Sequence, residues 1–134
     1  EELSVGMEAT VSRTITDTDL RNFTGVSGDT NPMHLNEEYA RETAFGGIIV
    51  HGMLTASLIS AVIGTRLPGP GCIYMRQTLS FLAPVRVGDT VYATARVTAL
   101  QPEKARAVLQ TRCVVGDTVV VDGEALIKVP RRAA

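Results

Sequence analysis

The uncharged stretch from Gly52 to Thr65 constrains the fold of this chain more than any other feature. A helix of this length spans about 21 Å, which is short of the ~30 Å hydrocarbon core of a bilayer. Its polar members are small hydroxyls, which can bond back to the preceding turn. Because a helix that is apolar nearly all round must be enclosed by protein, the stretch predicts a central buried helix and no membrane span. The Pro/Gly-rich segment Leu67–Gly71 ends it.

The residues before this helix predict one strand and two short helices. Loose alternation of apolar residues over Leu3–Ile15 predicts an opening strand. Thr16 and Asp19 have the spacing of a capping box, and Gly28 is placed to end the helix that follows. Asn36 can cap a second short helix that extends through Thr43.

The residues after the buried helix alternate with period two, which is typical of strands with one wet face. The pattern begins at Cys72, and a turn at Gly116-Asp117 joins its last two segments. Long antiparallel strands after one buried helix predict an α+β fold, with the sheet wrapped around the helix in a single domain over residues 1–134. The clearest segments are Val91–Ala99, Ala105–Val115 and Thr118–Val129.

Charge and cysteine content exclude several classes of partner. The formal net charge is -1, and no basic run is longer than Arg131-Arg132, so we expect a solvated tail there and no nucleic-acid partner. Cys72 and Cys113 lack metal-ligand spacing and are interpreted as buried thiols in a reducing compartment. No signal peptide is recognisable, so we expect a cytoplasmic location. The alternative is an organelle, reached by means of a leader removed before Glu1.

The densest polar segment of the chain is Gly28-Asp-Thr-Asn-Pro-Met-His34. Pro32 disfavours the α conformation at Asn31, so a turning segment can bring Asp29 and His34 over one small site. Asn31 can hold this loop by bonding local backbone. A carboxylate and an imidazole that share one water are suited to hydration chemistry. The alternative is that these are ordinary turn and packing residues.

His51 and Gly52 stand at the start of the buried helix. Amides near Gly52 would point out of the helix N-terminus, where they can stabilise an oxyanion on a thioester carbonyl. Glycine also permits close approach of a ligand. For His51, a capping or buried structural role is favoured over direct catalysis.

These motifs make the chain resemble the MaoC-like, (R)-specific enoyl-CoA hydratases, including the type 2 3-hydroxyacyl-thioester dehydratases. The resemblance implies a hot-dog fold and a homodimer whose substrate enters near the subunit boundary. It also implies fatty-acid metabolism, with reversible hydration of a trans-2-enoyl-CoA to the (R)-3-hydroxyacyl-CoA and no metal or other cofactor. The matching segments are Gly28–His34, Ala44–Leu54, Leu67–Gly71, Ser80-Phe81, Pro84-Val85 and Gly88-Asp89.

The resemblance also implies roles for individual residues. Asp29 and His34 would be the catalytic pair, Asn31 would support their loop, and the Gly52 N–H would form the oxyanion hole. On the buried helix, Ser60 matches a polar position near the family's site, with simple back-bonding as the alternative.

Ile63 falls where family members line the acyl pocket, and plain core packing is an equal alternative for it. The segment from Gly52 to Thr65 has no Asp or Glu, which weakens a thioesterase interpretation. Three alternatives stay open: an acyl-CoA thioesterase, an acyl-carrier-protein dehydratase and a non-catalytic module that binds acyl thioesters.

Overall fold

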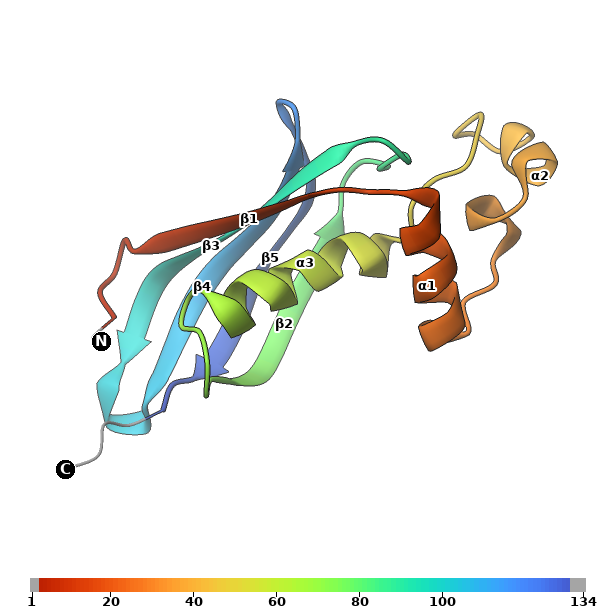
Figure 1. Ribbon diagram of the computed structural model, residues 1–134. Helices are drawn as coiled ribbons and strands as arrows, with labels where there is room; N and C mark the ends of the chain where they lie inside the picture. The colour runs from red at the N-terminus through yellow and green to blue at the C-terminus, as the bar shows by residue number, and fades with distance from the viewer. Residues whose placement is uncertain (1–2, 131–134) are drawn as a thin grey trace.

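A computed structural model describes residues 3–130 and shows one antiparallel sheet with a helix along one face (Figure 1). The strand order is β1-β3-β4-β5-β2, so β1 and β2 are the edges. The pair Arg131-Arg132 lies outside the described residues. The elements are β1 (Glu8–Thr14), α1 (Asp17–Ser27), the 3₁₀ turn η1 (Pro32–His34), α2 (Glu37–Arg41), α3 (Gly52–Thr65), β2 (Ile73–Phe81), β3 (Thr90–Gln101), η2 (Pro102–Lys104), β4 (Arg106–Val115) and β5 (Thr118–Lys128).

The core lies between α3 and the curved sheet, as the apolar stretch predicts. Ile59, Val62 and Ile63 of α3 are almost completely buried against the sheet. The inward residues of β3 are small, with Ala93 and Ala95 at 0% exposure, so the helix can approach the strands closely. The predicted hot-dog arrangement, a sheet wrapped around a buried central helix, is confirmed (Figure 1).

The two shorter helices gather at the end of the sheet where α3 begins (Figure 1). The capping box of Thr16 and Asp19 is present, and Gly28 ends α1 in the left-handed conformation with φ 77°. Asn36 caps α2 as predicted, but α2 ends at Arg41 rather than Thr43, because the chain turns there. The first strand also begins later than predicted, at Glu8, because a turn precedes it.

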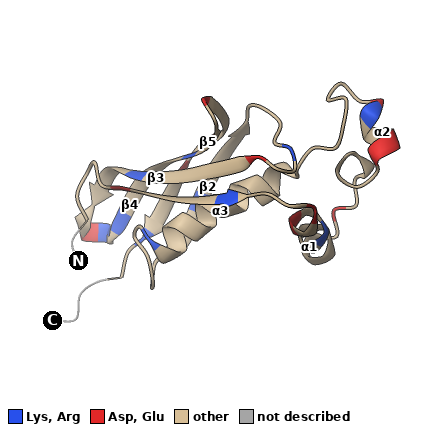
Figure 2. Ribbon diagram, turned by 45° about the horizontal axis from the view of Figure 1, so that its top comes forward, with Lys and Arg blue, Asp and Glu red and all other residues tan. Residues whose placement is uncertain are grey.

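The described chain has neither a segregated charged region in the ribbon view (Figure 2) nor a helix that could span a membrane. Lys and Arg are dispersed among Asp and Glu along the ribbon (Figure 2). Within residues 3–130, no helix is long and apolar enough to cross a bilayer.

Both cysteines are free thiols. Cys113 is fully buried, and this burial raises the pKa of its thiol to about 12. Cys72 is only partly buried, so its predicted burial is wrong in degree, since it lies in the loop that follows α3.

An ion pair fixes the start of α1 to the first strand. Arg13 donates two hydrogen bonds to the Asp19 carboxylate, at 2.6 and 3.0 Å, and the Thr16 N–H donates a third at 3.0 Å. The bond from Arg13 is the main cause that lowers the pKa of Asp19 to about 2. Since the folded pKa lies below the unfolded value, the pair stabilises the fold at pH values above about 4, and this stabilisation is lost as pH falls toward 2.

We therefore expect Asp19→Asn to lower the free energy of unfolding by about 1–2 kcal/mol at pH 7. The difference from the parent should shrink as pH falls from 5 toward 2, because the parent loses the same charge. Urea unfolding at a series of pH values measures this. Asp17→Asn is the control, because Asp17 makes only an exposed pair with Arg21. It should change stability by less than about 0.5 kcal/mol. A constant Asp19→Asn difference down to pH 2 would contradict the assignment.

Candidate active site

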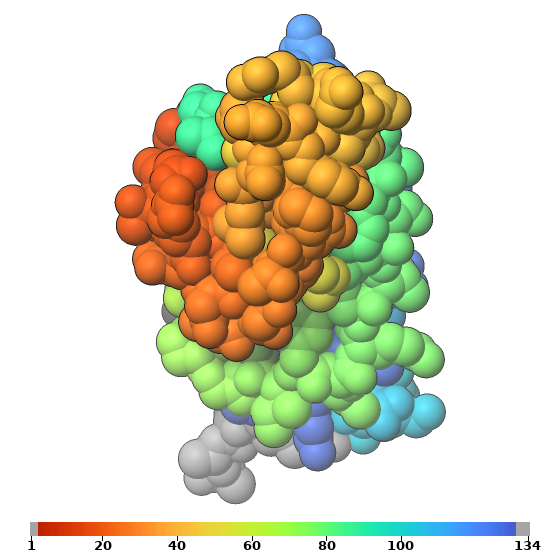
Figure 3. All heavy atoms as spheres, turned by 90° about the vertical axis from the view of Figure 1, so that its right-hand side faces the viewer, coloured from red at the N-terminus to blue at the C-terminus, as the bar shows by residue number. Residues whose placement is uncertain are grey.

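A cavity of about 480 Å³ lies at the end of the sheet where α1, the loop after it and the start of α3 meet. Figure 3 views the molecule from this end, where the orange residues that follow α1 cover much of the surface. Most of the wall is apolar, and a few polar groups face it from one side. The lining residues are Asp29, Met33, His34, Phe45, Ile49, Val50, His51, Gly52, Met53, Thr55, Phe81–Val85, Val120 and Val121.

Local hydrogen bonds shape the loop that carries Asp29. The Asp29 N–H donates to Ser27 Oγ at 3.1 Å, and the Asn31 N–H donates to Asp29 Oδ1 at 3.2 Å. Asn31 Oδ1 in turn accepts from the Met33 N–H at 3.2 Å, which is the local bond expected of this residue. These turns present the exposed Asp29 carboxylate to the cavity while its backbone is held in place.

His34 closes the 3₁₀ turn that Pro32 begins and is almost completely buried. Its Nδ1 lies 2.8 Å from the Ile49 carbonyl oxygen, which can only accept, so Nδ1 carries the proton. In the neutral ring, Nε2 is then free to accept a proton from the cavity side. One ligand atom each from Asp29, His34 and His51 lies within 4.8 Å of the others. At that spacing, one water can hydrogen-bond to the carboxylate and to the imidazole together.

His51 is a buried neighbour of this pair. Its ring stacks on His34 with centroids 4.0 Å apart, and its Nε2 lies 3.1 Å from Thr24 Oγ1. Burial, and secondarily the charge of His34, lower the pKa of His51, so it is neutral near pH 7. His51 occupies the N-cap position of α3, but its side chain makes no capping bond. The geometry places it in a buried, supporting position.

Gly52 is the first residue of α3 and lines the cavity. The Leu54 and Thr55 N–H groups donate to the His51 carbonyl, at 3.1 and 3.2 Å, so the amides of Gly52 and Met53 are the ones left at the helix N-terminus. A Cβ at Gly52 would lie 2.8 Å from two ring carbons of Phe81. Only glycine therefore fits beside this ring without displacing it.

Because of this contact, Gly52→Ala should lower kcat/KM for the enoyl-CoA that the sequence resemblance implies about tenfold or more, through overpacking at the cavity wall. Phe81→Leu removes the ring carbons that the new methyl group meets. If the loss arises from Phe81, the double variant Gly52→Ala/Phe81→Leu should recover most of it. No recovery would show that the methyl group obstructs the substrate itself, and a parental kcat/KM for Gly52→Ala alone would contradict close approach at this position.

Two further residues of α3 do not join the cavity in the described chain. Ser60 is exposed, and Ile63 is fully buried in the core. Thr55 does line it, with a buried Oγ1 that has no hydrogen-bond partner within residues 3–130. The sequence patterns did not identify this residue. Its position three residues after Gly52, on the same helix face, is the signal that could have found it.

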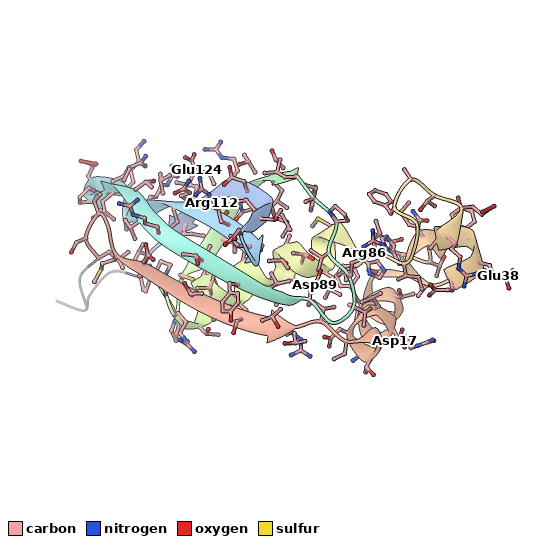
Figure 4. The ribbon with its side chains drawn as sticks, turned by 90° about the horizontal axis from the view of Figure 1, so that it is seen from above. Asp17, Glu38, Arg86, Asp89, Arg112 and Glu124 are labelled. Carbon is pink, nitrogen blue, oxygen red and sulfur yellow. The ribbon has the colours of Figure 1, made fainter. Side chains whose placement is uncertain are left out.

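The sequence patterns did not identify Arg86 either, although its side chain bonds to the backbone of the segment that forms one wall of the cavity. Its guanidinium donates to the Phe45 carbonyl at 2.6 Å and to the Ile48 carbonyl at 3.5 Å, and its N–H donates to Asp89 at 2.9 Å. Figure 4 shows Arg86 in the loop before β3, close to the segment that follows α2. The bond to its carbonyl thereby holds the backbone of Phe45 in place beside the cavity.

The trio of Asp29, His34 and His51 has the residue types of a metal site, but its geometry does not suit one. The two imidazoles stack with an angle of only 26° between their planes. Ring-nitrogen lone pairs lie in the ring plane, so those of stacked rings run side by side and do not converge on one ion. The arrangement suits a water held between Asp29 and His34 better than a chelated cation.

Comparisons with known proteins assign the chain to a family. The family model for the MaoC-like domain matches the sequence over residues 3–122. The chain belongs to the MaoC-like domain family. An (R)-specific enoyl-CoA hydratase from Rhodospirillum rubrum is 53% identical over 98% of this chain and 92% of its own length. A 3-hydroxybutyryl-CoA dehydratase from Methylorubrum extorquens is 52% identical over 98% of this chain and 84% of its own length.

One solved structure matches the fold of this chain over nearly its whole length. The (R)-hydratase from A. caviae, described as involved in PHA biosynthesis, superimposes with a TM-score of 0.93 at 46% identity. The match covers 97% of this chain and 99% of that one. The two chains therefore share one fold over nearly the full length of each.

Proposed function

We propose that this protein is an (R)-specific enoyl-CoA hydratase, which adds water reversibly to a trans-2-enoyl-CoA to give the (R)-3-hydroxyacyl-CoA. The observation that carries the proposal is the convergence of Asp29 and His34, within 4.8 Å, on a cavity whose other side is the N-terminus of α3. High identity over nearly the full length to an (R)-specific enoyl-CoA hydratase supports the same activity.

The thioester carbonyl is the group that activates the alkene. Its oxygen would accept a hydrogen bond from the Gly52 N–H, where the helix dipole also favours the negative charge that develops during addition. Apolar side chains around the opening, such as Phe45 and Phe81, would exclude bulk water from the acyl chain. The substrate thus binds with C3 facing the carboxylate and the imidazole.

Asp29 and His34 hold one water on a single face of the double bond. As the water oxygen bonds to C3, one of the two groups takes its proton, and a proton is delivered to C2 on the same face. The pair ends the cycle in its starting protonation state, so no other proton donor is consumed. Because the two groups act on one water, the acid and base roles belong to the pair rather than to either residue alone.

Hydration of crotonyl-CoA, followed by loss of enoyl absorbance and chiral analysis of the product, tests the proposal. We expect (R)-3-hydroxybutyryl-CoA, no release of free thiol, and unchanged activity after exhaustive chelation. Thiol release without loss of the enoyl absorbance would favour a thioesterase, and binding without turnover a non-catalytic module. Carrier-bound and CoA-bound substrates compared in the same assay separate an acyl-carrier-protein dehydratase.

We also propose a homodimer that forms through strand β2. The other edge strand, β1, is polar, whereas β2 and the residues after it expose large apolar side chains. An unpaired apolar edge invites pairing with a second chain. Phe81 and Leu82 belong to both this edge and the cavity wall, so the partner would border the substrate entrance. The exposed set is Ile73, Tyr74, Met75, Phe81 and Leu82.

Light scattering coupled to gel filtration tests the dimer. Met75→Glu should shift the protein toward the monomer mass, and Ser12→Glu on the opposite edge strand should leave the mass unchanged. Equal masses for the parent and both variants would contradict the β2 interface.

We also propose a cytoplasmic location. It is supported by the two free thiols and by the need of the proposed reaction for acyl-CoA.

A further inference from the structure

We propose that His51 is a positioning residue, which transmits the placement of α1 and α3 to the imidazole of His34. The inference rests on the proposed hydration reaction and adds a residue whose contacts lie behind the reacting groups. Three features of His51 carry it: its anchoring to α1, its stacking on His34, and a buried nitrogen without a partner.

Residues of α1 hold the His51 ring from behind. Thr24 Oγ1 lies 3.1 Å from Nε2, and the Phe23 ring packs at 4.8 Å between centroids with a 55° tilt. His51 is only 1% exposed, so its ring has little room to turn. Its own backbone carbonyl accepts from the first turn of α3, which contains the Gly52 amide. His51 therefore links α1 and the N-terminus of α3 to the imidazole ring of His34.

The stack restrains the freedom that His34 would otherwise keep. The hydrogen bond from Nδ1 to the Ile49 carbonyl fixes which nitrogen carries the proton, but a single bond permits rotation of the ring about that direction. Stacking against His51 at 4.0 Å fixes the plane as well. Together the two contacts point Nε2 toward the cavity, and a misplacement of about 1 Å at a reacting group can cost ~10²-fold in rate.

The nitrogen without a partner argues for a function at this position. His51 Nδ1 is buried and has no hydrogen-bond partner among the described residues. A buried orphan of this kind costs free energy, so an aliphatic side chain would stabilise the fold better if packing were the only need. A planar neutral ring, in contrast, can stack on His34 without placing a positive charge beside the reacting pair.

Three variants test the inference by kcat, KM and melting temperature. Thr24→Val removes the hydroxyl at Nε2 and little else, and should lower kcat about fivefold. His51→Phe keeps a stacking ring and should lose a similar factor. His51→Leu removes the planar ring and should lose about 10²-fold. In all three, KM should stay within about twofold, since substrate binding is not the step affected.

A double-mutant cycle separates positioning from general destabilisation. Thr24→Val should have no further effect on kcat in the His51→Phe background, because the bond it removes is already absent. Thr111→Val is the matched control, since Thr111 is also fully buried and hydrogen-bonded, to Gln77, but lies outside the cavity lining. It should lower the melting temperature without changing kcat.

Nitrogen-15 NMR reads the His34 tautomer directly, and the chain has only two histidines to assign. We expect a single Nδ1–H tautomer in the parent and in His51→Phe. In His51→Leu we expect an averaged signal, because a ring that the stack no longer holds turns away from the Ile49 carbonyl for part of the time and loses the bond that fixes the tautomer. Parental kcat and a single tautomer in Thr24→Val and His51→Leu would overturn the inference while the hydratase assignment stands. If the parent fails to hydrate enoyl-CoA, the proposed function fails instead, and the NMR comparison still decides whether His51 positions His34.

Discussion

Asp29→Asn is expected to lower kcat for hydration of crotonyl-CoA by about 10²–10⁴-fold, the usual effect of losing a positioned acid or base. The amide has the size of the carboxylate but cannot exchange a proton with the water. Its oxygen can still accept the turn bond from the Asn31 N–H, so the loop should keep its shape. KM should change little, because the carboxylate faces the water rather than the thioester.

Steady-state kinetics and thermal unfolding of the same preparations measure this effect. Glu38→Gln is the charge-matched control, because Glu38 is exposed on α2 and points away from the cavity end of α3 (Figure 4). It should retain parental kcat and KM. If Asp29→Asn hydrates at the parental rate with an unchanged melting temperature, the carboxylate is not part of the reaction.

The sequence predicted the parts of this molecule whose causes are local. The uncharged run from Gly52 to Thr65 is itself the central helix, with the same two ends, but only the face of it that packs on the sheet is buried. Pro32 breaks the segment that holds Asp29 and His34, and the structure brings the two side chains together over one cavity. Composition, capping and proline rules act within a few residues, so a single sequence contains them.

The contacts that the sequence did not predict join segments far apart in the chain. Thr24 and His51 meet only because α1 packs against the start of α3. Arg86 reaches Phe45 across a loop, and no charge or spacing pattern marks the pair. The partial exposure of Cys72 likewise depends on where the loop after α3 lies. Such contacts follow from packing between elements, which propensity and periodicity do not encode.

Two positions that the family resemblance assigns to the site, Ser60 and Ile63, do not line the cavity in the described chain. Ser60 and Ile63 were assigned to the site by analogy, but they lie along α3 beyond the residues that line the cavity of a single chain. Ile63 packs within the core, where its burial needs no ligand to explain it. A role for either in acyl binding stays a prediction, which chain-length profiles of Ser60→Ala and Ile63→Val would test.

His34→Gln is expected to lower kcat by a comparable factor, about 10²–10⁴-fold. Glutamine can keep a donor toward the Ile49 carbonyl, but it has no nitrogen that takes up a proton near neutral pH. The free energy of unfolding should fall by no more than about 1–2 kcal/mol, because the side chain is buried and one hydrogen bond is perturbed. Kinetics at several temperatures below the unfolding transition distinguish lost chemistry from lost folded protein.

The double variant Asp29→Asn/His34→Gln decides whether the two groups act as a unit. If both serve one water, removal of either already prevents the proton exchange, so the double variant should be little slower than the slower single variant. If the losses multiply instead, each group acts at a separate step, and a water shared between them is the wrong mechanism. The Glu38→Gln/His34→Gln pair provides the reference, because independent sites should give the product of their single effects.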